Sequence, residues 1–98
     1  MALMSEPVVS RQDDTRKQLG AFLRARRESL DPQRLGLPRS GRRRTPGLRR
    51  EEVAMLADVG VTWYTWLEQG RDVNPSSAVM AAVAKALQCT PTEARHLF

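Results

Sequence analysis

Apolar residues recur every three or four positions in several separate stretches of the chain. The first stretch begins at Asp14, and its apolar residues share one helical face: Leu19, Phe22, Leu23 and Leu30. This spacing is typical of an amphipathic helix, and Asp31-Pro32 predicts its end. Residues 1–13 show no such period and contain Pro7, so they are predicted to form a flexible leader.

Two short helices are predicted in the middle of the chain. Glu51 and Glu52 suit the positive end of a helix that runs to about Asp58. Its apolar and small residues are predicted to lie on one packed arc: Val53, Ala54, Leu56 and Ala57. A second helix over about 60–69 follows the turn, and Gly70 is predicted to end it in a left-handed conformation.

Two further helices complete the pattern. One is predicted from Pro75 or Ser76 to Gln88, with apolar residues four positions apart, and the other follows Thr90, which with Glu93 forms a capping-box signature. No stretch has the alternation of a strand. The sequence therefore predicts an all-α fold of five helices in one domain over residues 14–98.

The aromatic residues of the second short helix cannot all face the core. At about 100° per residue, Tyr64 and Leu67 fall on the inward side and Trp63 falls at its margin. The opposite side carries Val61, Thr62, Thr65 and Trp66. A large ring on an exposed face of a small domain suggests contact with a partner, and burial of Trp66 against the arginine loop or a second subunit is the alternative.

Charge narrows the class of partner. The formal net charge is +5, and fourteen of the sixteen basic residues are arginine. Seven of these arginines lie between Arg34 and Arg50, in a segment rich in proline and glycine that is predicted to be an extended loop. Arginine's planar fork suits phosphates and base edges, so a nucleic acid is favoured over an acidic membrane surface.

Other chemistry is not indicated. The only cysteine is Cys89, so no intrachain disulfide is possible, and neither it nor His96 has partners at metal-ligand spacing. We expect no cofactor and no enzymatic activity, because the sequence has neither a phosphate-binding glycine loop nor a catalytic constellation. Without a signal peptide or an apolar run of membrane length, a cytoplasmic location is expected.

Two short helices joined by a tight turn have the form of a helix-turn-helix, here about residues 49–70. Over roughly residues 16–98, the sequence resembles the lambda-repressor-like, Cro/XRE class of bacterial transcription regulators. The matching positions are Val53-Ala54, Asp58-Val59, Glu68-Gln69-Gly70 and Pro75-Ser76. More narrowly, "GLPRSGRRRTPGLRREEVAMLADVGVTWYTWLEQGR" is similar to the N-terminal domain of the MmyB-like subfamily.

The sequence departs from the family pattern at three points. Asp58 stands where the turn usually has glycine, and Gly60 stands where the second helix usually has a serine or threonine cap. Both residues are permitted there at some cost in stability. We also expect the chain to lack the C-terminal ligand-sensing domain that is typical of the subfamily.

The resemblance implies a specific division of roles. The second short helix would lie in the major groove as the recognition helix, with four base-contacting residues: Val61, Thr62, Thr65 and Trp66. Five arginines would hold phosphates or enter the minor groove: Arg42, Arg43, Arg44, Arg49 and Arg50. Arg27 and Glu68 would form a partly buried ion pair that fixes the recognition helix. A homodimer on a palindromic operator, in the bacterial cytoplasm at the nucleoid, is expected of the class.

Two other functions fit parts of the sequence. A protein-interaction adaptor could use the same helical fold to hold another protein. The arginine loop could also bind RNA or a membrane surface without sequence preference, or be solvated with no partner. Discrimination between a specific and a random DNA duplex separates sequence-specific regulation from these alternatives.

Overall fold

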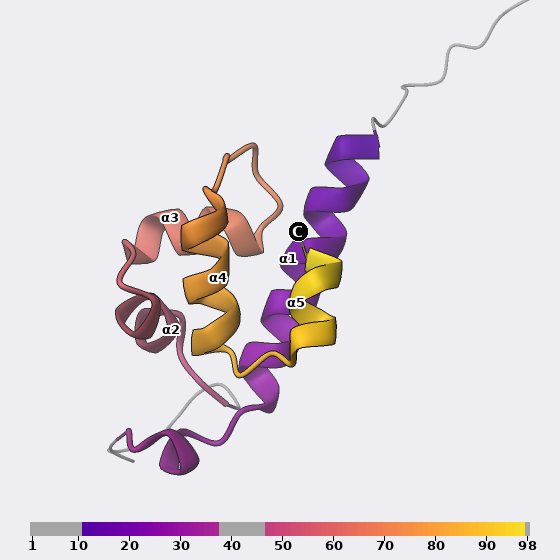
Figure 1. The fold of residues 1–98 in the computed structure, drawn as a ribbon. Helices are drawn as coiled ribbons and strands as arrows, with labels where there is room; N and C mark the ends of the chain where they lie inside the picture. The colour runs from indigo at the N-terminus through magenta and orange to yellow at the C-terminus, as the bar shows by residue number, and fades with distance from the viewer. Residues whose placement is uncertain (1–10, 38–46, 98) are drawn as a thin grey trace, which may run out of the picture.

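The fold is all-α, as predicted. The structure, a computed structural model, describes residues 11–37 and 47–97, and these form five α-helices and no strand (Figure 1). The helices are α1 (Arg11–Ser29), α2 (Arg50–Ala57), α3 (Val61–Glu68), α4 (Ser77–Ala86) and α5 (Pro91–Leu97). In Figure 1, α2, α3 and α4 form a group beside the long helix α1, and α5 lies near α1 at the other side.

The first helix differs from its prediction at its start and is followed by an element that was not predicted. α1 begins at Arg11 rather than at Asp14, so the last residues assigned to the leader are helical, while residues 1–10 lie outside the described part of the chain. After α1, a short 3-10 helix, η1 (Pro32–Leu35), occupies the start of the predicted loop. It forms because the Asp31 carboxylate accepts a hydrogen bond from the Gln33 N–H at 3.0 Å, and because Pro32 fits a first helical position.

The turn between α2 and α3 accommodates Asp58 at the position where the family usually has glycine. Asp58 adopts the left-handed conformation with φ 58° and ψ 49°. This lets the Val59 N–H donate to the Ala54 carbonyl at 2.9 Å and close the end of α2. Gly60 is the N-cap of α3 in extended conformation, and its carbonyl accepts the Tyr64 N–H at 3.0 Å. The two short helices and this turn form the helix-turn-helix unit.

The core lies where α1, α2, α3 and α4 meet. Its fully buried large side chains are Leu23, Leu48, Val53, Tyr64, Val83 and Leu87. The prediction that Leu56 is packed with Val53, Ala54 and Ala57 is wrong, because its side chain is 42% exposed. The other three define an arc centred roughly 110° away from Leu56 around the helix, so Leu56 lies at the edge that turns to solvent.

A glycine in α1 lets α1 and α3 approach each other closely. Gly20 is buried, and a Cβ atom added to it would lie 2.2 Å from the carbonyl oxygen of Glu68. No side chain can occupy that space without moving the backbone of α3. Sequence reasoning did not single out Gly20, because its role depends on a helix that is distant in sequence.

Arg26, a residue of α1, contacts the end of α4 and the start of α5. Its guanidinium donates to the carbonyls of Leu87, at 3.1 Å, and Gln88, at 2.6 Å, and so satisfies acceptors at the end of α4. It also lies 3.4 Å from the Glu93 carboxylate in α5. The predicted capping box of α5 is present, because Thr90 and Glu93 each accept the other's backbone N–H.

Replacing Gly20 by alanine tests the close crossing of α1 and α3. We expect Gly20→Ala to lower the free energy of unfolding by about 2 kcal/mol, because the new methyl group overlaps the backbone of α3. Urea denaturation followed by circular dichroism measures this change. If only helix propensity mattered, the substitution would instead stabilise the domain by about 1 kcal/mol, and that result would contradict the crossing.

Candidate nucleic-acid interface

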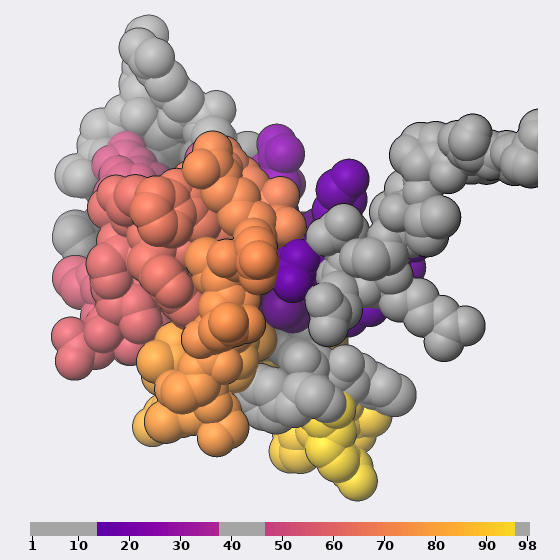
Figure 2. Space-filling view, turned by 90° about the horizontal axis from the view of Figure 1, so that it is seen from above, coloured from indigo at the N-terminus to yellow at the C-terminus, as the bar shows by residue number. Residues whose placement is uncertain are grey.

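The outer face of α3 is open to solvent. Val61 and Trp66 are each 40% exposed, and Thr62 lies between them on the exposed side. On the opposite side Tyr64 and Leu67 are buried, and Trp63 is partly buried against the core. α3 and the turn after it lie next to each other on the face of the molecule seen in Figure 2. The division of the aromatic residues between core and surface is therefore as predicted.

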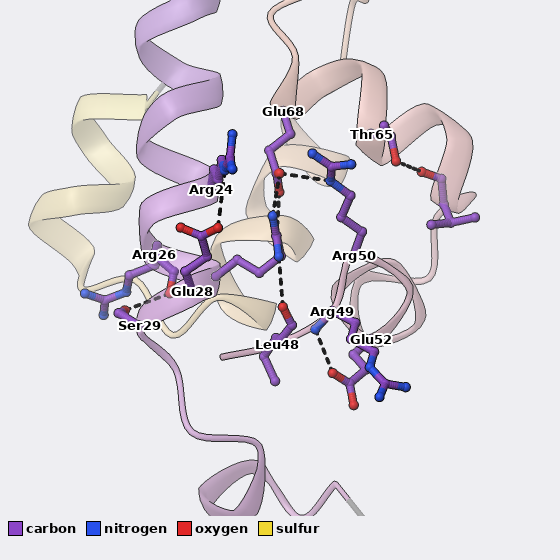
Figure 3. Close-up of polar contacts among 12 residues, drawn as sticks. Arg24, Arg26, Glu28, Ser29, Leu48, Arg49, Arg50, Glu52, Thr65 and Glu68 are labelled. Atoms are coloured by element: carbon purple, nitrogen blue, oxygen red, sulfur yellow. Dashed lines mark hydrogen bonds and ion pairs between the residues drawn. The ribbon is translucent and has the colours of Figure 1, made fainter. Parts of the chain in front are cut away.

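The Thr65 side chain is less available to a partner than the other side chains on this face. Its side chain is half-buried, and its hydroxyl donates to the Val61 carbonyl of the same helix at 2.8 Å (Figure 3). The hydroxyl proton is therefore used within α3. Only the oxygen lone pairs and the methyl group remain for a partner.

A buried ion pair fixes the far end of α3 to α1. Arg27 Nε and Nη2 donate to the two carboxylate oxygens of Glu68, each at 2.8 Å (Figure 3). The two side chains are only 5% and 1% exposed. The predicted pair is present and is more buried than expected. Such a two-point contact fixes both the distance and the orientation of the two helices.

Arg50 joins this pair from the start of α2. Its Nε donates to the Glu68 carboxylate at 3.1 Å, while its side chain is 36% exposed. One carboxylate thus holds arginines from α1 and α2. Sequence reasoning assigned Arg50 only to a phosphate, and the structure shows that it also has a partner within the domain.

Burial and charge act in opposite directions on the Glu68 carboxyl. Burial raises its pKa, but the hydrogen bonds and positive charge of Arg27, with the hydrogen bond from Arg50, outweigh this effect. The pKa of Glu68 is therefore below its ordinary value of 4.5. The hydrogen bond to Glu68 raises the pKa of Arg27, so both members are charged at neutral pH.

The Tyr64 hydroxyl is buried beside this cluster. Among the described residues no hydrogen-bond partner of good geometry is found for it. Burial, together with the negative charge of Glu68, raises the pKa of the phenol, so it remains protonated over the whole working range of pH.

The segment before α2 is held by the same arginine. The Leu48 side chain is fully buried, its N–H donates to the Arg27 carbonyl at 3.0 Å, and its carbonyl accepts from Arg27 Nη1 at 2.9 Å. Gly47 precedes it with φ 73°, and a Cβ there would lie 2.4 Å from the Arg27 carbonyl oxygen. Sequence reasoning assigned no role to Leu48, although an isolated leucine after Pro46-Gly47 in a basic segment was the available signal.

The remaining predicted arginines divide into two groups. Arg49 is the N-cap of α2; its side chain is half-buried, and its backbone N–H donates to the Glu52 carboxylate at 2.7 Å. Arg49 and Arg50 therefore stand side by side at the start of the helix-turn-helix unit. Arg42, Arg43 and Arg44 lie outside the described residues.

Comparison with known proteins identifies one family. The family described as a helix-turn-helix domain matches residues 18–97. No curated protein and no solved structure matches the chain. Within residues 11–37 and 47–97, none of the helices is both long enough and apolar enough to cross a bilayer.

Removing the charge of Glu68 tests the buried pair. We expect Glu68→Gln to lower the free energy of unfolding by about 3 kcal/mol in urea denaturation, because it leaves the Arg27 guanidinium buried without its counter-ion. Glu28→Gln is the matched control, since Glu28 pairs with the exposed Arg24 at 3.3 Å and should change stability by less than about 0.5 kcal/mol. Equal effects of the two substitutions would contradict the role given to the buried pair.

Acid should weaken the same contact. Because the pKa of Glu68 is lowered in the folded state, its contribution to stability is present above the unfolded pKa and is lost as the pH falls through the folded pKa. The difference in unfolding free energy between wild type and Glu68→Gln should therefore shrink as the pH falls below about 4.5, the ordinary pKa of the group. Urea denaturation of both proteins above and below that pH measures it. A difference that stays constant would show that the Glu68 charge is not responsible.

Proposed function

This chain belongs to the helix-turn-helix domain family, and we propose that it binds double-stranded DNA sequence-specifically as a bacterial transcription regulator of the XRE class. The resemblance of residues 36–71 to the MmyB-like subfamily supports this narrower assignment. α3 is then the recognition helix in the major groove, and α2 crosses the DNA backbone.

The outer face of α3 is the observation that carries the proposal. It presents two apolar side chains and hydroxyl groups, Val61 and Trp66 with Thr62 and Thr65, on a helix whose inner side is buried in the core. The methyl groups of valine and threonine can pack on thymine methyls, and Thr62 can donate to a base edge. Trp66 can lie against a sugar or a thymine methyl. Thr65 contributes through its methyl group and oxygen lone pairs.

The arginines at the start of α2 fit contacts to the DNA backbone. Arg50 is oriented by Glu68 yet remains 36% exposed, so part of its guanidinium can meet a phosphate. Arg49 is next to it. On sequence grounds we assign Arg42, Arg43 and Arg44 to the same backbone or to the adjacent minor groove. In such a complex phosphate contacts set position and base contacts set sequence preference.

Binding as a homodimer to a palindromic operator completes the proposal. The class places two recognition helices in half-sites about 34 Å apart, one turn of the double helix. The protein would then act in the cytoplasm, at the nucleoid.

A protein-interaction adaptor is the second candidate function. The observation that favours it is the exposure of two apolar side chains on α2, Met55 at 62% and Leu56 at 42%. Exposed apolar residues that lie together are typical of protein contacts. An adaptor would show no preference between DNA duplexes.

Selection from a random DNA pool tests the proposal. Duplexes that the protein retains are sequenced, and its affinity for the selected duplex is compared with that for a scrambled one; we expect at least about 10³-fold preference and a palindromic motif.

Thr62→Ala should reduce the preference roughly tenfold at one base position, whereas Arg49→Ala should weaken binding to both duplexes alike. Met55→Ala is the control on α2 and should leave both affinities unchanged.

The outcomes separate the two functions. Equal binding to selected and scrambled duplexes would contradict sequence-specific regulation. A preference that Thr62→Ala leaves intact, but Met55→Ala removes, would place the DNA contact on α2 instead of α3.

A further inference from the structure

The end of α3 has a backbone geometry that brings Arg71 over Trp66. The Arg71 N–H donates to the Trp66 carbonyl at 3.0 Å, and the Gly70 N–H donates to the Leu67 carbonyl at 3.2 Å. These two bonds form a Schellman motif, which Gly70 permits with φ 75°. In this motif the residue after the glycine commonly makes a hydrophobic contact with the helix residue five or six positions earlier. Here that contact joins an arginine to a tryptophan.

Two contacts hold the guanidinium of Arg71 at the end of α3. Its central carbon lies 5.8 Å from the centroid of the Trp66 ring, a cation–π contact. Its Nε donates to the Gln69 side-chain oxygen at 3.1 Å. With Nε bonded to Gln69 and the residue exposed, the two terminal nitrogens still present a planar set of N–H donors.

We propose that Arg71, held on Trp66, binds a DNA phosphate at the rim of the groove that α3 enters. This inference rests on the proposed function. The N-terminal residues of a recognition helix reach base edges, so a residue beyond its C-terminal end lies nearer the backbone. The adjacent Asp72 pairs with Arg16 at 3.0 Å, which offsets the one negative charge next to Arg71 in sequence. A planar fork of donors matches two phosphate oxygens.

The salt dependence of binding tests this contact. Affinity of the wild type and of Arg71→Ala is measured for the selected and scrambled duplexes between about 50 and 200 mM salt. We expect Arg71→Ala to weaken binding to both duplexes by about tenfold at low salt and to reduce the slope of log affinity against log salt by about 0.9, the value of one phosphate. Arg95→Ala is the matched control, because it removes an exposed arginine from α5.

A double-mutant cycle tests the role of the ring. If Trp66 positions Arg71, then Arg71→Ala should weaken binding at least about threefold less in the Trp66→Ala background than in the wild type. Circular dichroism and urea denaturation verify that each variant is folded, since the substitutions leave Gly70 and its backbone bonds in place.

Each outcome bears on one proposal. If the wild type prefers the selected duplex but Arg71→Ala behaves like Arg95→Ala, the phosphate contact is wrong and DNA recognition by α3 stands. If Arg71→Ala lowers affinity for the selected duplex alone, Arg71 reads a base and the assignment to phosphate is overturned. If the wild type binds neither duplex, both proposals fail.

Discussion

The arrangement of the helix-turn-helix unit depends on the buried contact between Arg27 and Glu68. Both carboxylate oxygens of Glu68 accept hydrogen bonds from Arg27, and the contact joins the last turn of α1 to the last residue of α3. The same carboxylate binds Arg50 at the start of α2, and the Arg27 guanidinium also holds the Leu48 carbonyl. One ion pair therefore places three segments relative to one another. Because burying two charges is costly, its main contribution is to define geometry, and stability depends on both partners being present.

This contact explains how a small domain can present a rigid surface. α3 has only eight residues, too few to be stable as an isolated helix. It is held from its inner side by Tyr64 and Leu67, and at its end by Glu68. The outer side is thereby left free, and the left-handed Gly70 turns the chain so that Arg71 packs back on Trp66. Orientation is thus set before binding, which reduces the conformational entropy lost on association.

The sequence predicted most of the helices because their apolar periods and caps are local features. The split of α3 into a core side and an exposed side followed from the helical period alone. Its ion pair came from the family resemblance, since no local rule joins residues 27 and 68. Gly20, Leu48 and Arg71 were missed because their roles depend on contacts with other segments or on the turn geometry: Gly20 on the backbone of α3, Leu48 on Arg27, and Arg71 on the Trp66 ring. Leu56 was misplaced because it was grouped with Val53, Ala54 and Ala57, although the helical period sets it roughly 110° from the centre of their arc.

We propose that α3 and the start of α2 form the DNA-binding face. Titrating the isotope-labelled protein with its selected duplex, while recording the backbone amide NMR shifts, tests this most directly. We expect the largest changes on residues 60–66, on residues 49–50 and at Arg71, with small changes in α5. Changes centred on α4 and α5, or on Met55 and Leu56 with α3 unaffected, would contradict it.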